Sequence, residues 1–340
     1  MMNRLSRRRF IRILGSASTL SLLPFPLTPL LAQENTFHWK GRALGAEAKL
    51  IFVGLSQSQS NKLIELCTRE IDRLERIFSL FLPGSSIRDL NNNGELISPP
   101  SELVEVLRFA RQLSRQTDGA FDVSIQPLWH YLYYLGDKIP DETTLNQLKQ
   151  RVDYRQISIS QQKISFGLSR MKITLNGIAQ GYITDSVVQL LKQNGVQHAL
   201  IQLGETVGLG KNQEGYPWKI ALKHPQALSK PMHTVDLEDM ALSTSGGYGT
   251  SLHPKTSRHH LLNGRNGISP NYFQSLSVLA PSATIADGLS TALSLVPTEK
   301  HTEILSQYTH TSTIMHYPPI ITEKTKSIPF KFTPLTCRYY

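Results

Sequence analysis

The chain has 340 residues, of which 40% are hydrophobic and 18% charged, a composition typical of a globular protein with a sizeable core. It carries 36 Lys and Arg against 26 Asp and Glu, a net charge of +10, and five of the arginines lie in the first 32 residues. Without these five, 31 basic side chains face 26 acidic ones, with no basic tract, which argues against nucleic-acid binding.

The first 32 residues contain no acid and predict an export leader. The paired arginines Arg7 and Arg8 precede an apolar run over 13–31 that three prolines interrupt, a pattern typical of the twin-arginine signal. This signal predicts export of the folded protein to the periplasm. Ala32 suits the last leader position, but Leu30 is larger than the residue usually found there. An uncleaved leader that anchors the protein in the inner membrane is therefore the alternative.

The region from 33 to 340 alternates strand and helix patterns. Residues 48–53 predict a strand, and an apolar stripe predicts a helix that Ser60 caps and that ends near Ile77. The turn formers of 78–94 predict a loop long enough to bind a ligand, and a second helix is expected from Ser101 to near Gly119.

The second half of this region continues the alternation. It predicts, in chain order, two strands within 156–174, a helix over 178–193 ended by Gly195, a strand over 196–203, short strands and glycine-rich loops from 218, a strand over 274–279 and a helix over 282–296. No linker or internal repeat divides these elements, so we expect one interleaved α+β domain.

The cysteines and histidines exclude two common site types. Cys67 lies on an apolar helical stripe and predicts a buried structural thiol, and a disulfide to Cys337, the only other cysteine, is permitted by the exported compartment. The 11 histidines show no zinc-ligand spacing, and the chain has no Walker loop or complete GxGxxG. Zinc hydrolysis and dinucleotide binding by a Rossmann unit therefore lose support.

Asp287 and Thr291 form the pattern that says most about chemistry. On a helix these residues lie about 40° apart around the axis, while Leu289 and Leu293 gather on the opposite side. A carboxylate and a hydroxyl are oxygen ligands, which suit Mg²⁺ better than zinc. An ordinary solvated helix face is the alternative.

The segment 176–181 joins a predicted strand to the helix over 178–193. A turn of this kind presents free backbone N–H groups at a helix N-terminus, which favours binding of phosphate oxygens. The alternative is a tight turn in which Gly177 and Gly181 serve only close packing.

The order of these segments resembles the ApbE family, the FAD:protein FMN transferases, from about residue 43 to 296. The resemblance implies a single ApbE-like, T-fold-like domain with mixed or antiparallel sheets and packed helices. Five family motifs occur in order: Gly119-Ala120-Phe121-Asp122 with Pro127-Leu128, Gly177-Ile178-Ala179-Gln180-Gly181-Tyr182, Thr244-Ser245-Gly246, the segment from His260 to Gly267, and Ala286-Asp287 with Thr291.

The resemblance implies a transferase that moves FMN from FAD to a Thr or Ser of a partner protein through a phosphodiester, with release of AMP. Mg²⁺ would be held by the Asp287 carboxylate, the Thr291 hydroxyl and the Ala179 carbonyl, and would bridge to the FAD pyrophosphate. His260 would be the base that accepts the proton of the acceptor hydroxyl. A loop histidine that only donates a hydrogen bond is the alternative.

The resemblance also implies where FAD binds. The loop around Ser79, Phe81, Ser85 and Asn91 would contact the flavin, although core packing accounts equally well for Phe81, and Asp122 would either position ligand or cap a turn. The full set of expected FAD contacts is Ser79, Phe81, Asn91, Asp122, Gly177, Ala179, Gln180, Gly204, Glu205, Thr206, Thr244, Ser245, Gly246 and His260.

Four segments depart from the family pattern. The early Met-Gly-Thr is Leu44-Gly45-Ala46, an Asp is Thr174, a Lys is Gln180, and Asp-Pro-x-Thr is Asn263-Gly264-Arg265-Asn266. A neutral Gln180 attracts phosphate less than a Lys does, and Asn263 cannot act as a carboxylate. Two other functions therefore remain open: a Mg²⁺-dependent FAD pyrophosphatase that forms FMN and AMP, and a non-catalytic protein that binds or delivers FAD.

The flavin acceptor is expected to be another protein, because the chain contains no Ser/Thr-Gly-Ala-Ser/Thr target of its own. The resemblance implies an exported or membrane-bound electron-transfer subunit that carries such a target. Sodium-pumping quinone reductase, its electron-bifurcating relatives and the nitrous oxide reductase accessory protein are acceptors of this kind.

Overall fold

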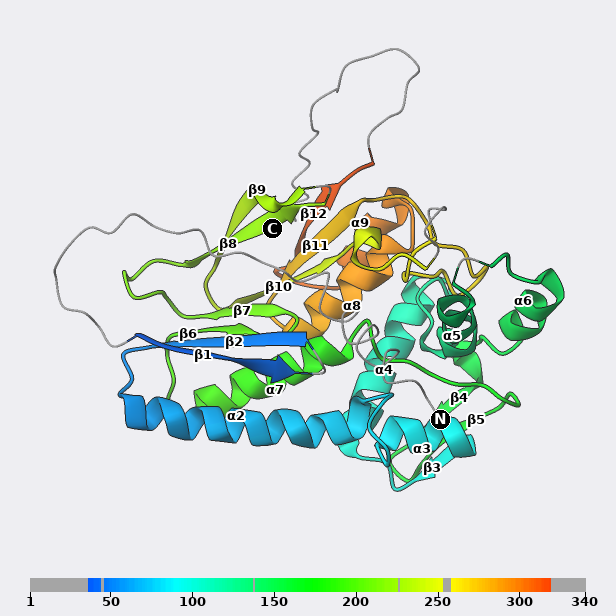
Figure 1. Ribbon diagram of the computed structural model, residues 1–340, viewed down its shortest axis with the longest axis horizontal. Coiled ribbons are helices and arrows are strands. Elements are labelled where there is room, and N and C mark those ends of the chain that lie inside the picture. Colours follow the sequence, from blue (N-terminus) through cyan, green and yellow to red (C-terminus); the bar gives the residue numbers. More distant parts are fainter. Residues whose placement is uncertain (1–35, 44–45, 137, 226, 253–257, 319–340) are drawn as a thin grey trace, which may run out of the picture.

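A seven-stranded sheet lies at the centre of the computed structural model, which describes residues 36–318 apart from 44–45, 137, 226 and 253–257 (Figure 1). Every neighbouring pair of strands in the sheet is antiparallel. Its order is β1 (Thr36–Ala43), β2 (Ala46–Val53), β6 (Ala199–Gln202), β7 (Thr206–Leu209), β10 (Met240–Ser245), β11 (Ser275–Ala280) and β12 (Ser312–His316). Strands from both ends of the described chain share one sheet, which confirms the predicted interleaved α+β fold.

The two faces of this sheet are covered differently. Successive side chains of a strand point to opposite faces, so Leu50 and Phe52 of β2 join the core under the helices, whereas Ile51 and Val53 join a second cluster. This second cluster also contains Trp218 and other residues of a two-stranded hairpin, formed by β8 (Trp218–His224) and β9 (Ala227–Leu237). The hairpin therefore covers the face of the sheet that the helices leave open.

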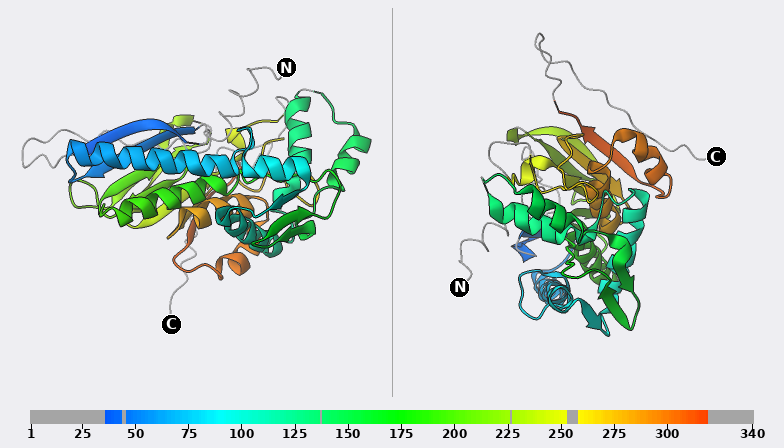
Figure 2. Two further views of the ribbon diagram at one scale, coloured as in Figure 1. Left: turned by 90° about the horizontal axis from the view of Figure 1, so that it is seen from below. Right: turned by 90° about the vertical axis from the view of Figure 1, so that its right-hand side faces the viewer.

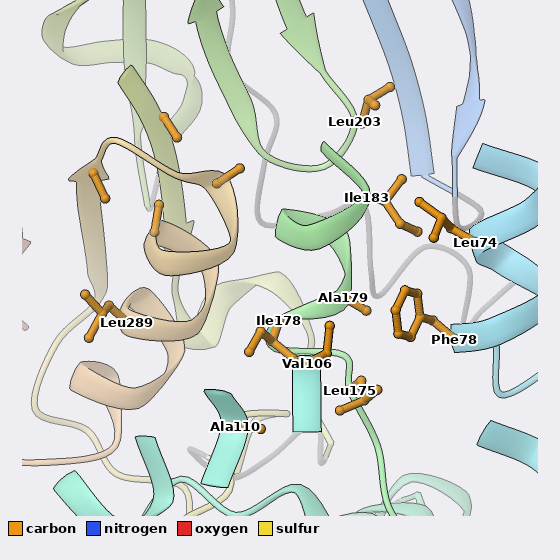
Figure 3. Packing of buried hydrophobic residues seen from close by; sticks show 14 of the residues in the cluster. Leu74, Phe78, Val106, Ala110, Leu175, Ile178, Ala179, Ile183, Leu203 and Leu289 are labelled. Atoms are coloured by element: carbon orange, nitrogen blue, oxygen red, sulfur yellow. The ribbon is translucent and has the colours of Figure 1, made fainter. Parts of the chain in front are cut away.

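Three helices cover the other face: α2 (Gln57–Phe78), α7 (Ala179–Gln193) and α8 (Ala283–Ser294). Figure 2 shows α2 and α7 side by side along the strands. Figure 3 shows Leu74 and Phe78 of α2 facing Ile183 and Ala179 of α7, all of them buried. This packing fixes the start of α7 relative to the sheet.

A smaller group of elements lies at one end of the sheet, around α4 (Figure 1). It contains a three-stranded antiparallel sheet in the order β3, β5, β4 and four helices. Within the described ranges no helix combines the length and the apolarity that crossing a membrane requires. The bounds are α3 (Ser86–Asn93), β3 (Glu95–Ile97), α4 (Ser101–Gln116), α5 (Gln126–Leu135), α6 (Glu142–Lys149), β4 (Ile157–Ile159) and β5 (Lys163–Phe166), and near the end of the chain α9 (His301–Leu305).

Two sequence predictions in the first helical region were wrong. Helix α2 begins at Gln57, because Ser56 and Gln59 form a capping box, and Ser60 lies buried inside the helix. The segment predicted as a ligand loop contains α3, which ends at Gly94. Ile87 and Leu90 of α3 are fully buried, and the burial of these two side chains outweighs the turn preference of the asparagines around them.

The predictions for α7 and for Cys67 were correct. Gly195 has a φ of 81° and follows α7 in a Schellman motif, in which its N–H donates to the Lys192 carbonyl and that of Val196 to the Leu191 carbonyl. Burial of Cys67 raises the pKa of its thiol to about 12, as expected for a structural cysteine. The predicted export leader, Leu44, Gly45 and Cys337 lie outside the described residues.

Helices α7 and α8 approach each other most closely at Gly181. A Cβ atom on Gly181 would overlap the Ala283 carbonyl oxygen and would lie 2.8 Å from the Asp287 Cβ. Above this contact, the Asp185 carboxylate of α7 accepts hydrogen bonds from the backbone N–H groups of Ala283 and Thr284 at the start of α8. The two helices are therefore held together at the level of Asp287.

We expect Gly181→Ala to lower the free energy of unfolding by about 1–3 kcal/mol, because the added methyl group forces α7 and α8 apart. Urea denaturation followed by circular dichroism measures this change. Gln189→Ala, at an exposed position of the same helix, is the control and should shift the midpoint little. A Gly181→Ala midpoint equal to that of the control would contradict the close contact.

Candidate active site

A cavity of about 120 Å³ lies between the start of α7, the middle of α8 and the end of β10. Segments that are far apart in the sequence meet there, as the predicted motifs require. Thr244 and Ser245 contribute from the end of strand β10, not from a loop as their sequence indicated. The predicted residues that line the cavity are Asp122, Gly177, Gln180, Glu205, Thr244, Ser245, His260, Asp287 and Thr291.

Asp287 and Thr291 face the cavity from a helix that is enclosed by protein. Asp287 exposes 5% of its surface, and Ser290 next to it is fully buried, so the alternative of a solvated helix face is wrong. The Gly181 N–H donates to Asp287 Oδ2 at 2.9 Å, while Oδ1 has no hydrogen-bond partner among the residues that the structure describes. One oxygen of the carboxylate is thus fixed and the other is left for a ligand.

Gly177 brings the turn before α7 directly against Thr291. A Cβ atom on Gly177 would lie 3.0 Å from the Thr291 Oγ1, so any larger residue would press on this hydroxyl. Both glycines of the predicted phosphate turn therefore allow close packing, and the packing occurs at the two candidate metal ligands.

The same turn offers fewer free N–H groups than its sequence predicts. The Leu175 carbonyl accepts hydrogen bonds from Ile178 and Ala179, and Gly181 donates to Asp287. In the described part of the chain, the N–H groups of Gly177 and Gln180 have no acceptor. Two backbone donors therefore remain at this helix N-terminus for an anionic ligand.

Glu205 and Asp287 form a buried pair of carboxylates. Each exposes 5% of its surface, and the cavity lining contains no Lys or Arg. Burial raises the pKa of both groups, to about 7 for Asp287, and the charge of Asp287 adds to the increase for Glu205. Ser243 donates a hydrogen bond to Glu205, which opposes this increase.

Gln180 lies beside this pair at the position where the family has a Lys. Its Nε2 is buried without a hydrogen-bond partner among the described residues. A Cβ on Gly204, whose φ is 106°, would lie 2.7 Å from the Gln180 Cδ, so the amide packs against the backbone just before Glu205. The site therefore holds the unsatisfied N–H donor of the Gln180 amide, where a Lys side chain would have offset the charges of Glu205 and Asp287.

A chain of hydroxyl groups connects these residues, and the sequence analysis missed two of its members. Ser290 Oγ lies 3.0 Å from Ser243 Oγ and 2.8 Å from Ser245 Oγ, and Ser245 Oγ lies 3.3 Å from Thr291 Oγ1. The spacing of Ser243 and Ser245, which places them on one face of β10, was the available signal. The chain links Glu205 to Thr291 and orients both.

The oxygen atoms of this site fit a hard divalent cation. Only oxygen ligands are available: the unpaired Asp287 oxygen, the Thr291 hydroxyl and the Glu205 carboxylate. The described residues contain no group of three or more His, Cys, Asp or Glu that could hold a metal. Ala179 is buried at the first position of α7 and does not line the cavity, so its carbonyl as a ligand stays a prediction.

His260 lies in the cavity wall as a neutral imidazole. Its Nδ1 is 3.4 Å from the Thr250 carbonyl oxygen, which can only accept, so Nδ1 carries the proton. Burial, and then the neighbouring His259, lowers the pKa of His260 to about 4. Its Nε2 has no hydrogen-bond partner within the described ranges and is free to accept a proton, although the pKa lies below the value near working pH that a general base needs.

The loop residues predicted to contact the flavin lie outside the cavity lining. Ser79 Oγ accepts hydrogen bonds from the backbone of Phe81 and Leu82, and Ser85 Oγ donates to the Ser79 carbonyl. Asn91 exchanges two hydrogen bonds with the backbone of Ile173. These polar groups stabilise the chain itself, and their contact with flavin stays a prediction.

Other predicted residues also have structural partners. Phe81 packs against an apolar cluster that includes Leu128 and Trp129, as its core-packing alternative proposed. Asp122 caps the turn after it, since Oδ1 accepts from the Ser124 N–H, and Oδ2 accepts from the Tyr154 N–H. Asp122 also lines the cavity, whereas Gly204, Thr206 and Gly246 do not.

The sequence analysis did not predict the apolar wall of the cavity, although some residues of this wall lie within the family motifs. It is formed by Phe121, Val123, Ile125, Trp129, Leu261, Leu262 and Leu295. Trp129 also donates from Nε1 to the His260 carbonyl oxygen at 3.1 Å, and so fixes the segment that carries His260. No local signal separates such a residue from ordinary core.

Comparison with known proteins agrees with these features. The ApbE family model matches residues 44–315. The FAD:protein FMN transferase of Klebsiella pneumoniae is 23% identical to this chain over 309 residues, which cover 87% of this chain and 88% of that protein. The protein of the same name from Haemophilus influenzae is 27% identical over 282 residues, which cover 78% and 82%.

Solved structures share the fold. The flavin transferase ApbE from Vibrio cholerae matches with a TM-score of 0.73 and 23% identity, over 83% of this chain and 93% of that chain. The apo form of Pseudomonas stutzeri flavinyl transferase ApbE matches with a TM-score of 0.72 and 24% identity, over 84% and 92%. At these identities the likeness shows the architecture.

We expect Glu205→Gln to stabilise the metal-free protein at pH 8, because it removes one of two neighbouring carboxylates whose pKa values are raised by burial. The raised pKa values mean that the folded protein holds protons that the unfolded chain releases above about pH 4. This contribution to stability is complete below pH 4 and is lost as the pH rises through about 7, the pKa of Asp287. The Glu205→Gln variant lacks one of the two buried carboxylates, so its free energy of unfolding should fall less as the pH rises.

Urea denaturation in EDTA between pH 4 and pH 8 measures this difference. Glu214→Gln, at an exposed position, is the control and should follow the unmodified protein at every pH. Curves for Glu205→Gln and the unmodified protein that stay parallel over this range would show that the two buried carboxylates do not repel each other.

Proposed function

Because the chain belongs to the ApbE family, we propose that it is a Mg²⁺-dependent FAD:protein FMN transferase. The observation that carries the proposal is the meeting of Asp287, Thr291 and His260 in one cavity, which combines oxygen ligands for a cation with an imidazole that can accept a proton. The names of the relatives from Klebsiella pneumoniae and Haemophilus influenzae support the same activity.

The cavity suits the diphosphate of FAD. Its volume of about 120 Å³ is smaller than the roughly 300–1,000 Å³ of pockets that enclose whole drug-sized ligands, so we assign only the diphosphate region to it. A Mg²⁺ ion held by Asp287, Thr291 and the Ala179 carbonyl would supply positive charge to the diphosphate. The free N–H groups of Gly177 and Gln180 and the Gln180 amide donate hydrogen bonds to phosphate oxygens.

His260 accepts the proton in the transfer step. The hydroxyl oxygen of the acceptor Thr or Ser forms a bond to the phosphorus on the FMN side, its proton moves to His260 Nε2, and the bond from that phosphorus to the AMP oxygen breaks. AMP leaves with the electron pair of that bond. A negatively charged diphosphate nearby raises the pKa of His260 from its value of about 4, which makes the imidazole a stronger base while FAD is bound.

A non-catalytic protein that binds FAD, which the neutral Gln180 and Asn263 favour, is one further candidate, and a FAD pyrophosphatase is the other. In that reaction water replaces the acceptor hydroxyl, and FMN and AMP are both released. A non-catalytic FAD-binding protein would form neither product. An assay of AMP with and without acceptor separates the three functions.

The acceptor and the compartment are part of the proposal. The leader supports export to the periplasm by the twin-arginine pathway, with inner-membrane anchoring if the leader is not cleaved. An acceptor that meets this protein is then itself exported or membrane-bound, and carries a Ser/Thr-Gly-Ala-Ser/Thr target.

In-gel flavin fluorescence tests the proposed activity directly. The mature protein is incubated with FAD, Mg²⁺ and an acceptor domain bearing Ser-Gly-Ala-Thr, and the mixture is separated by denaturing electrophoresis. A fluorescent acceptor band that disappears with EDTA supports covalent FMN transfer. A dark band with AMP in solution supports the pyrophosphatase.

We expect Asp287→Ala to reduce the rate of FMN transfer by at least about 100-fold, because the cavity loses the carboxylate that faces Thr291. Transfer rates at a series of Mg²⁺ concentrations measure the loss, and Asp236→Ala on the surface is the control. An unchanged rate in Asp287→Ala would remove the proposed metal site.

We expect His260→Ala to bind FAD like the unmodified protein and to lose transfer by about 10²–10⁴-fold, the range for a general base. FAD affinity is measured by fluorescence titration, and transfer by the in-gel assay, with the exposed His38→Ala as control. Equal turnover in His260→Ala and His38→Ala would assign the proton transfer to another group.

A further inference from the structure

A second concave surface lies next to the cavity, and we call it the basic cleft. It runs between the end of α4, the segment 263–272 and residues 295–300, and encloses about 480 Å³. Arg265, Asn266, Tyr272 and Lys300 line it, and the mechanism uses none of them. Its volume is in the range that encloses several side chains of a bound ligand.

The basic cleft adjoins the cavity. Leu295 lines both, one helical turn beyond Thr291, and Asn263 Nδ2 donates to the Leu295 carbonyl oxygen at 3.2 Å. Ala120 lines the cleft, and the next residue, Phe121, lines the cavity. The segment that carries Arg265 begins at His260. A chain in the cleft therefore comes close to the proposed base.

The basic cleft carries excess positive charge. Arg265 is exposed, and its guanidinium has no hydrogen bond or ion pair to any residue that the structure describes. Lys300 Nζ lies 3.4 Å from Asp118 Oδ2, and both side chains are about half exposed, so this pair is weak. Two cations thus face one carboxylate, which favours an anionic partner.

Apolar side chains lie beside these charges. Tyr272, which lines the cleft, exposes 42% of its surface, and Ile268, four residues earlier in the chain, exposes 62%. Arg and Tyr are enriched in protein interfaces, and exposed large apolar groups gain free energy when a partner covers them. A small anion such as phosphate would leave these apolar side chains uncovered.

We propose that the basic cleft binds the acceptor polypeptide, as a segment with acidic side chains next to the Thr that receives FMN. This inference rests on the proposed transferase function, because only a transferase needs a protein acceptor. Arg265 and Lys300 pair with the acidic side chains, and Ile268 and Tyr272 cover apolar ones. Because Leu295 lines both the cleft and the cavity, a chain bound in the cleft places its hydroxyl next to the cavity.

Two synthetic peptides test the proposal without depending on turnover. Both contain Ser-Gly-Ala-Thr and a fluorescent label, one with Asp and Glu on each side of the target and one with Lys, and fluorescence anisotropy measures their binding. We expect the unmodified protein to bind the acidic peptide at least tenfold more tightly. A protein carrying Arg265→Glu and Lys300→Glu should reverse the preference.

The control exchanges two exposed lysines on the helical face of the molecule, Lys62→Glu and Lys192→Glu, and so changes the net charge equally. It should keep the preference of the unmodified protein. Equal affinity for both peptides, binding of neither, or the same preference in the control and the cleft variant would each overturn the proposal.

Transfer kinetics separate this inference from the proposed function. With an acidic acceptor, the cleft variant should show a KM at least tenfold higher and a kcat within about twofold, and its FAD affinity and melting temperature should match those of the control. A protein that binds the acidic peptide through Arg265 and Lys300 but forms no fluorescent acceptor would retain the cleft as a peptide site and lose the transferase activity. A fluorescent acceptor formed by the cleft variant with an unchanged KM would support the transferase activity and overturn the cleft as the acceptor site.

Discussion

The close contact between α7 and α8 is the constraint on which the candidate site depends. Gly181 lets the two helices approach until its own N–H reaches the Asp287 carboxylate, and the same approach brings Gly177 against Thr291. Asp185 fixes the other side of the contact through the start of α8. The Gly181 N–H of α7 therefore orients Asp287, the turn before α7 contacts Thr291, and α2 packs against the start of α7.

The sequence predicted the elements whose signals are local and missed those that depend on tertiary contacts. Gly195 ended α7 where expected because a Schellman motif needs little beyond a residue that accepts positive φ. Helix α3 was missed because its asparagines favour turns in isolation, whereas the burial of Ile87 and Leu90 decides its conformation. The start of α2 at Gln57 depends on the pairing of the capping residue Ser56 with the Gln59 side chain, which the apolar stripe does not reveal.

The candidate site also divides into residues that a local sequence signal predicts and residues that only tertiary contacts bring together. Most of the predicted residues that line the cavity lie inside family motifs, although Ala179 and Gly246 belong to such motifs and do not line it. Ser290 was missed because a single hydroxyl has no pattern in one sequence, whereas for Ser243 the spacing to Ser245 on one face of β10 was a signal that was not used. The contacts of both serines connect Glu205 with Thr291. Ser79 is the opposite case, a polar residue in a segment rich in turn formers whose hydroxyl is used by the neighbouring backbone.

Two of the three losses of charge, at Asn263 and at Gln180, have different physical meanings. Asn263 donates to the Leu295 carbonyl oxygen, which an ionised Asp could not do, so this amide has a structural role. Gln180 has no such role, because its buried Nε2 lacks a partner among the described residues. Asp122, Glu205 and Asp287 line the cavity without a Lys or Arg, and the diphosphate of a bound FAD would add negative charge to this site. In the proposed function, attraction for the substrate would then come from a divalent cation and from N–H donors.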